Sequence, residues 1–84
     1  MIRILYFARL RETLGVAEEA LAWDPRWHSV ADLGAALAAR GGTWGAAFAP
    51  GPTLLCAVNQ TLARPETPLG DGDEVAFFPP VTGG

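Results

Sequence analysis

The last two residues of the chain, Gly83 and Gly84, suggest a specific chemistry. Neither carries a Cβ, so this segment can be threaded through a narrow slot that leaves the carboxylate of Gly84 open to attack. A carboxylate becomes a good acyl donor when its oxygen is converted to a leaving group, as adenylation by ATP would do. A sulfur nucleophile could then form a terminal thiocarboxylate. Taken alone, the dipeptide also fits a frayed terminus, since the chain contains ten glycines.

Two prolines precede this end of the chain. Pro79 and Pro80 cannot donate hydrogen bonds to a sheet, and they favour an extended backbone. We therefore expect a folded domain over residues 1–78 and an extended, flexible tail over residues 79–84. In this tail, the residues that carry Gly84 away from the domain are Pro79, Pro80, Val81, Thr82 and Gly83.

Other residues that could act in catalysis or metal binding are more simply explained by structural roles. Cys56 lies within an apolar segment, where a cysteine is usually a small buried hydrophobe. His28 has no second His or Cys at a spacing typical of a metal site. Asp71 and Asp73 flank Gly72 and are typical of a turn. We predict no metal site.

The hydrophobic pattern predicts several strands and one substantial helix. Ser29 is a good N-cap, and Val30, Leu33 and Leu37 then form an apolar stripe that ends near Arg40. Gly41-Gly42 follows this helix and is not expected to open another, which argues against a phosphate loop. A shorter helix is expected over residues 8–14, and one helical turn around 44–48. The expected strands are 1–7, 18–23, 54–58, 61–63 and 74–78.

This order of elements predicts an α+β fold. A long helix with one apolar stripe needs a sheet to cover, and a mixed sheet of four or five strands over one main helix is the economical packing. The first and last strands are both apolar and could lie side by side at the centre. That arrangement is the β-grasp, or ubiquitin-like, fold.

Composition narrows the class of protein. The chain has 84 residues, six basic and nine acidic, and no lysine, giving a net charge of −3. This balance argues against nucleic acid or anionic lipid as a partner. A single cysteine excludes an internal disulfide. With no apolar run near membrane-spanning length and no recognisable signal sequence, we expect a soluble cytoplasmic protein.

Two stretches of the sequence are more informative about function than the composition is. Residues 57–62 read Ala-Val-Asn-Gln-Thr-Leu, and residues 71–84 contain Asp-Gly-Asp-Glu-Val followed by Phe-Phe-Pro-Pro-Val-Thr-Gly-Gly. Together with the opening Ile-Arg-Ile-Leu-Tyr-Phe-Ala at residues 2–8, they resemble the small subunit of molybdopterin synthase. The resemblance covers the first quarter and last third of the chain, while residues 41–53 do not match the pattern.

The resemblance implies a sulfur carrier of molybdenum cofactor biosynthesis. In that family an activating enzyme adenylates the position of Gly84 with ATP, and a sulfur donor system converts it to a thiocarboxylate. The tail then donates sulfur to cyclic pyranopterin monophosphate inside the large subunit, and two visits complete the dithiolene. The complete synthase pairs two small with two large subunits. The chain is therefore expected to bind no cofactor and to be a sulfur donor rather than an enzyme.

A partner interface is expected on one face of the sheet. If Ile2, Ile4 and Tyr6 face the helix, alternation turns Phe7 outward, and Phe78 likewise faces out if Phe77 faces in. The resemblance implies that Phe7, Leu62 and Phe78 form an apolar docking patch with Arg11 at its rim. The alternative is that the apolar three are ordinary core residues.

Three other functions remain open from the sequence. Sulfur carriers for thiamin or for tRNA thiolation share the fold and the Gly-Gly end. A ubiquitin-like modifier would attach Gly84 to lysines of other proteins, although chains built on its own lysines are excluded. A plain binding module would leave the tail inert.

Overall fold

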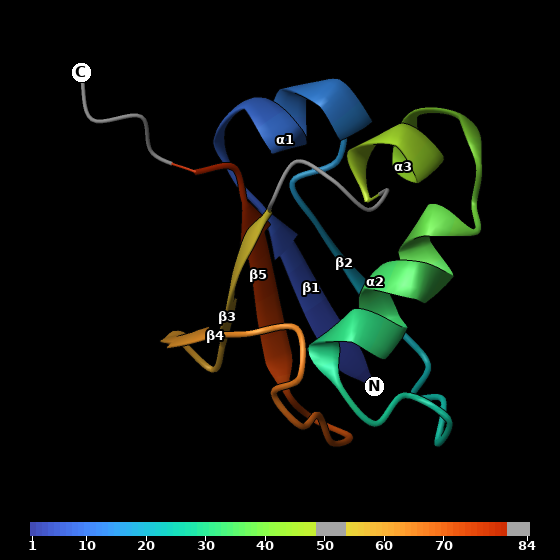
Figure 1. Ribbon diagram of the computed structural model, residues 1–84, viewed down its shortest axis with the longest axis vertical. Coiled ribbons are helices and arrows are strands. Elements are labelled where there is room, and N and C mark those ends of the chain that lie inside the picture. Colours follow the sequence, from blue (N-terminus) through green and yellow to red (C-terminus); the bar gives the residue numbers. More distant parts are fainter. Residues whose placement is uncertain (49–53, 81–84) are drawn as a thin grey trace.

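One five-stranded sheet forms the centre of the molecule (Figure 1). The computed structural model describes residues 1–48 and 54–80. The strands lie in the order β2-β1-β5-β3-β4, in which β1 and β5 are parallel and every other neighbouring pair is antiparallel. Their bounds are β1 Ile2–Tyr6, β2 Glu18–Leu21, β3 Leu55–Val58, β4 Thr61–Ala63 and β5 Glu74–Phe78. The mixed sheet and its central β1–β5 pair confirm the expected β-grasp fold.

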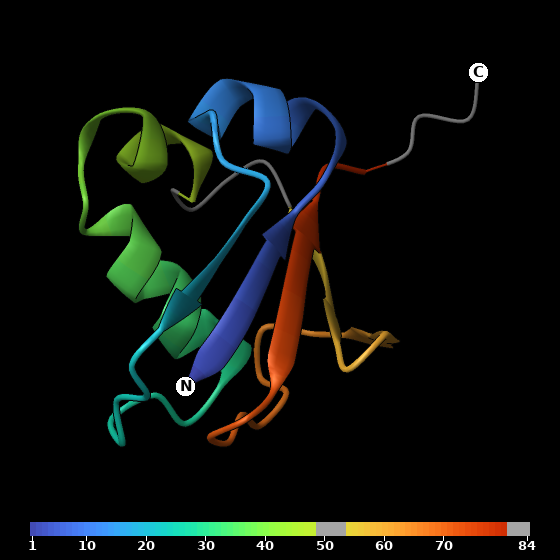
Figure 2. The ribbon, with the colours of Figure 1, turned by 180° about the vertical axis from the view of Figure 1, so that it is seen from behind.

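The core lies between the sheet and its longest helix. Alternation along β1 buries Ile2, Ile4 and Tyr6, and the parallel register sets Ile4 opposite Val75 and Tyr6 opposite Phe77. Figure 2 shows strands β1 (blue) and β5 (red) side by side at the centre of the sheet. Five buried residues of the two central strands therefore face the helical side: Ile2, Ile4, Tyr6, Val75 and Phe77. The alternate residues of these two strands point to the other face of the sheet.

Helix α2 (Val30–Ala38) covers the inner face of the sheet. It starts with a complete capping box, because the Ser29 hydroxyl accepts from the Asp32 N–H while the Asp32 carboxylate accepts from the Ser29 N–H. The sequence predicted Ser29 as the cap. Val30, Leu33 and Leu37 are buried, which confirms the predicted stripe.

Two short helices complete the helical layer. Helix α1 (Ala8–Leu14) buries Leu10 and ends at Gly15, whose left-handed backbone (φ 72°) lets its N–H cap the Arg11 carbonyl. Helix α3 (Gly42–Ala47) is longer than the single turn expected around residues 44–48. The expectation that Gly41-Gly42 opens no helix is wrong, because Gly41 is the N-cap of α3 and Gly42 its first residue.

Aromatic packing explains why α3 forms despite its glycines. The ring of Trp44 lies edge-on to Tyr6 at 5.4 Å between centroids, and the Arg40 guanidinium lies over the Trp44 ring at 4.3 Å. Phe48, directly after α3, is edge-on to Phe77 at 5.1 Å. Tertiary contacts with the core thus stabilise a helix that has weak intrinsic propensity.

A tight turn joins β3 to β4. Asn59 and Gln60 both have left-handed backbones, with φ of 51° and 70°, as a two-residue type I′ hairpin turn requires. The Asn59 side chain donates to the Asp73 carboxylate at 3.0 Å and accepts from the Glu74 N–H at 3.0 Å. Asn59, three residues before Leu62, therefore ties the hairpin to the start of β5.

Candidate functional site

Phe7 and Phe78 lie side by side at the end of the two central strands. The last register pair of β1 and β5 is Tyr6 with Phe77, and the Phe7 N–H donates to the Phe77 carbonyl at 3.1 Å. Because Tyr6 and Phe77 face the core, the next residue on each strand faces the opposite side of the sheet. The two rings are thus placed on the outer face where β5 ends.

Smaller apolar residues extend this surface across the sheet. Ala76 of β5 pairs with Ala57 of β3, which pairs in turn with Leu62 of β4. Phe78 pairs with Leu55 in the same sheet. We call the outward-facing group the outer-face patch; its members are Phe7, Leu55, Ala57, Leu62, Ala76 and Phe78.

The exposure of the patch distinguishes it from the core. Phe7 is 46% exposed and Leu62 is 71% exposed, whereas Phe78 is half-buried. An ordinary core position is therefore ruled out for Phe7 and Leu62. A contiguous exposed apolar surface is typical of a site that meets another protein.

Arg11 lies on the exposed surface of α1, four residues after Phe7. Arg3, on the outer side of β1, is paired with Glu18 at 2.6 Å and lies 3.8 Å from Glu74. These two carboxylates raise the pKa of the Arg3 guanidinium, mainly through the hydrogen bond to Glu18. Arg3 and Glu74 lie near the start of β1 and β5, whereas Phe7 and Phe78 lie at the other end of these strands.

The predicted tail begins where the outer-face patch ends. Strand β5 finishes at Phe78, and Pro79 and Pro80 follow it without sheet pairing. The end of this strand at Phe78 is the one that the sequence predicted. Val81, Thr82, Gly83 and Gly84 lie outside the described residues.

The remaining chemical candidates from the sequence have structural roles. Cys56 is 5% exposed, and burial raises the pKa of its thiol, as expected for a packed cysteine. The Asp73 carboxylate accepts from the Gly70 N–H at 2.8 Å, consistent with turn chemistry. Across residues 1–48 and 54–80, no group of three or more His, Cys, Asp or Glu side chains could hold a metal ion.

Glu19 is the centre of a partly buried polar contact. Its carboxylate accepts from both terminal nitrogens of Arg40, at 2.9 and 3.0 Å, and from the Tyr6 hydroxyl at 2.7 Å. The Arg40 hydrogen bonds, more than any other cause, hold the pKa of Glu19 below its ordinary value. Burial and the contact with Glu19 raise the pKa of Tyr6. This group joins β1 and β2 to the segment after α2, and it lies on the face of the sheet opposite the patch.

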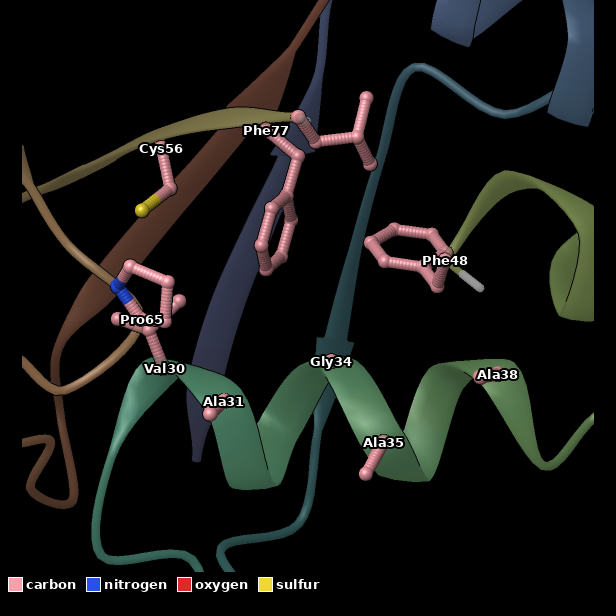
Figure 3. A pocket seen from close by; sticks show the side chains of 10 residues that line it. Val30, Ala31, Gly34, Ala35, Ala38, Phe48, Cys56, Pro65 and Phe77 are labelled. Atoms are coloured by element: carbon pink, nitrogen blue, oxygen red, sulfur yellow. The ribbon is translucent and has the colours of Figure 1, made fainter. Parts of the chain in front are cut away.

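An apolar cavity of about 590 Å³ lies between α2 and the sheet (Figure 3). Its walls include Gly34 and Ala38 of α2, together with Phe48, Cys56 and Phe77. Apart from the Cys56 thiol, the described side chains around it offer no ionisable group. Among residues 1–48 and 54–80, its lining has none of the paired acids, bases or hydrogen-bond donors that a catalytic pocket requires.

Sequence reasoning missed the middle of the outer-face patch. Leu55, Ala57 and Ala76 are apolar but unremarkable, and alternation alone does not show which strands are neighbours. The register Ala57–Ala76 becomes visible only when β3 is seen to pair with β5 rather than with β1.

No helix in the described ranges is long and apolar enough to cross a membrane.

Comparison with known proteins gives consistent matches. A model described as the ThiS family matches residues 4–84. The molybdopterin synthase sulfur carrier subunit of Escherichia coli (strain K12) is 49% identical over 84 residues, and the alignment covers 100% of both chains. The subunit of the same name from Haemophilus influenzae is 42% identical, again over 100% of both chains.

The fold also matches a solved structure that carries a different name. SAMP1 from Haloferax volcanii, a small archaeal modifier protein, has a TM-score of 0.75 and 26% sequence identity. The match covers 99% of this chain and 98% of that chain. The chain is thus similar both to sulfur carrier subunits and to a protein modifier.

Proposed function

Because this chain belongs to the ThiS family, we propose that it is the sulfur carrier of a molybdopterin synthase. The observation that carries the proposal is the end-to-end alignment with the E. coli sulfur carrier subunit, at 49% identity. In that alignment Gly84 corresponds to the last residue of the relative. The working group is then the carboxylate of Gly84, presented by the tail that begins at Pro79.

The proposed cycle has two activating steps. A Gly84 carboxylate oxygen attacks the α-phosphorus of ATP on an activating enzyme, which releases pyrophosphate and leaves an acyl adenylate. A sulfur nucleophile from a donor system then attacks the acyl carbon and displaces AMP. With a persulfide donor the product is an acyl disulfide, and a second thiol then attacks the donor's sulfur atom, which breaks the S–S bond. The donor is left as a disulfide, and the carrier is left as a thiocarboxylate in which one terminal oxygen has been replaced by sulfur. ATP is thus used by the enzyme, and no cofactor is assigned to this chain.

Sulfur transfer then takes place on another chain. We propose that the tail enters the large subunit and gives its sulfur to cyclic pyranopterin monophosphate, in a synthase of two small and two large subunits. The likeness to a relative named as a sulfur carrier subunit supports a donor role. Catalytic side chains would belong to the large subunit.

The outer-face patch supplies the docking surface in this proposal. Phe7 and Phe78 lie at the base of the tail, so a partner that binds them receives the tail at a fixed starting point. Leu62 extends the contact across β4, and Arg11 on α1 offers a charge at the rim. Apolar anchors with a polar rim are the usual anatomy of a protein interface.

Intact-mass measurement tests the sulfur-carrier role. The chain is incubated with its activating enzyme, ATP and a sulfur donor, and we expect one oxygen to be replaced by one sulfur at Gly84. A variant that lacks Gly84 should fold equally well and show no replacement, while omission of ATP serves as the enzyme control. An unchanged mass with an enzyme proven active on another carrier would contradict the proposal.

Adding the thiocarboxylated chain to the large subunit and cyclic pyranopterin monophosphate tests the pathway. Formation of the dithiolene product supports molybdenum cofactor biosynthesis. Sulfur loading without this product would point instead to another sulfur pathway, such as thiamin synthesis or tRNA thiolation.

A second candidate is a protein modifier, which the likeness to SAMP1 favours. Here the activated Gly84 carbonyl would form an isopeptide bond with a lysine amine of a target protein. The chain itself contains no lysine, so such a bond would always join it to a different protein. Adducts that resist thiol and hydroxylamine and carry Gly84 on a lysine would identify this activity.

A further inference from the structure

Left-handed backbone occurs beside the exposed side chains of the outer-face patch. In residues 1–48 and 54–80, three residues other than glycine have a positive φ: Ala8 at 55°, Asn59 at 51° and Gln60 at 70°. Ala8 directly follows Phe7, and the Asn59–Gln60 turn leads into the strand that carries Leu62. Strained backbone that persists in a fold is often found at functional sites.

Ala8 is the least expected of the three. Asparagine tolerates this conformation, and the β3–β4 hairpin requires it at both turn positions. Neither explanation for a positive φ applies to Ala8. Its side chain is exposed, so side-chain packing does not favour the strained backbone either. The cause must lie in its neighbours.

Those neighbours fix the chain on both sides of Ala8. The Phe7 N–H donates to the Phe77 carbonyl at 3.1 Å, which keeps Phe7 in line with the sheet. Three residues later Leu10 is 5% exposed in the core, and the Arg11 N–H donates to the Phe7 carbonyl at 3.3 Å. The chain must therefore reverse within about one residue, from a strand that points Phe7 outward to a helix that points Leu10 inward.

We propose that Ala8 is a positioning residue for docking: its left-handed backbone holds Phe7 beside Phe78 before any partner binds. This inference rests on the proposed docking role of the outer-face patch. An ordinary negative φ at Ala8 would break either the Phe7–Phe77 hydrogen bond or the burial of Leu10. A side chain that is already placed loses less freedom on binding, so the turn raises affinity without touching the partner.

Substitutions at Ala8 separate backbone conformation from bulk. Ala8→Val introduces a β-branched residue that strongly disfavours positive φ, whereas Ala8→Asn is larger than alanine but tolerates it. With the large subunit of the synthase as the probe, we expect Ala8→Val to weaken binding about tenfold. Ala8→Asn should stay within about twofold. Ala35→Val, on the exposed surface of α2, controls for adding a valine.

A double-mutant cycle with Phe7→Ala tests whether Ala8 acts through Phe7. In the Phe7→Ala background, Ala8→Val should change the dissociation constant by less than about twofold, because there is no ring left to position. A direct clash between the new valine and the partner would instead persist in that background. Persistence of the full effect would overturn the inference.

The outcomes also separate this inference from the function on which it rests. If Phe7→Ala weakens binding and Ala8→Val does not, the positioning role is wrong and the docking patch stands. If Phe7→Ala leaves binding unchanged, the patch itself is wrong, and so is the role of Ala8. The mass shift at Gly84 is independent of both results.

Ala8→Thr keeps the inference testable if the valine variant fails to fold. Threonine is β-branched and disfavours positive φ as valine does, but its hydroxyl suits an exposed position. We expect affinity for the large subunit to fall about fivefold, and this loss to vanish in the Phe7→Ala background. Unchanged affinity of a folded Ala8→Thr variant would contradict a positioning role.

Discussion

Arg40 donates two hydrogen bonds to Glu19, one to each carboxylate oxygen, at 3.0 and 2.9 Å. The two residues lie 21 positions apart, so the contact joins the segment after α2 to the edge strand β2. Tyr6 donates to the same carboxylate from the central strand. The contact therefore connects three elements around one partly buried charge.

Replacing Glu19 with glutamine should destabilise the fold in a pH-dependent manner. At neutral pH we expect a loss of about 1–2 kcal/mol in the free energy of unfolding, since charge-assisted hydrogen bonds are weakened. The folded-state pKa of Glu19 lies below its ordinary value of 4.5. Its contribution is therefore complete above that pH and is lost as pH falls through the folded-state pKa.

Urea unfolding of both proteins from neutral to acidic pH measures this effect. The two stability curves should converge in acid, because protonated Glu19 resembles glutamine. Arg40→Lys is the matched control, since it keeps the charge but loses the two-pronged geometry. A difference that stays constant across the titration would contradict the proposed role of the carboxylate.

Phe78→Asp should weaken partner binding more than it weakens the fold. The ring lies on the outer face beside Phe7 and is half-buried, so the core is left intact. We expect affinity for the large subunit to fall by more than about tenfold, as for an apolar anchor replaced by a charge. Calorimetry and urea unfolding would measure the two effects separately.

Ala35→Asp, on the exposed surface of α2, is the control for Phe78→Asp. It adds the same charge to the helical side of the sheet and should leave binding unchanged. If Phe78→Asp unfolds the protein, Phe78 belongs to the core instead of the docking patch.

Cys56 should play no part in sulfur transfer. Its thiol is buried and its pKa is raised, so the reactive thiolate is scarce. Cys56→Ala should show the same sulfur incorporation at Gly84 as the parent chain, with about 1 kcal/mol lost from stability for the removed sulfur. In the native parent, a thiol reagent should react slowly, and urea should speed the reaction. Loss of sulfur incorporation in a folded Cys56→Ala variant would require a sulfur relay through this residue.

Gln60→Gly should stabilise the β3–β4 hairpin. Glutamine is strained at φ 70°, whereas glycine adopts this backbone freely. We expect a gain of about 0.5 kcal/mol, because relief of strain outweighs the extra entropy of glycine in the unfolded chain. Thermal unfolding would measure the change.

Asn59→Gly is the informative comparison for that turn. It relieves the same kind of backbone strain but removes the side-chain hydrogen bonds to Asp73 and to the Glu74 N–H. We therefore expect a net loss of about 1 kcal/mol. Equal effects of the two glycines would mean that these hydrogen bonds add nothing.

Local patterns predicted most of the fold. Alternation gave the inward Ile2, Ile4 and Tyr6, and the Ser29 cap with its apolar stripe gave α2. Element ends were less accurate: the first strand ends at Tyr6 rather than Phe7, and the second at Leu21 rather than Trp23. Phe7 leaves the strand because it is also the N-cap of α1.

What the sequence missed depends on contacts between distant residues. Helix α3 forms because Trp44 packs on Tyr6 and under Arg40, and neither contact follows from the Gly-Thr-Trp-Gly sequence around it. The Glu19–Arg40 pair and the Ala57–Ala76 register likewise require the folded sheet. The exposed Phe7 was predicted, but the left-handed Ala8 that presents it has no sequence signature.

The parallel pairing of β1 and β5 also has a consequence for how the chain is made. Strand β5, residues 74–78, supplies Val75 and Phe77 to the core and separates β1 from β3. During synthesis, the sheet therefore cannot form completely until the last strand, β5, has been made. A nascent or truncated chain that lacks β5 has no complete hydrophobic core and no joined surface around Phe7. Only a chain that includes residues 74–78 can close this sheet, so every copy with a complete core also reaches the point where the tail begins.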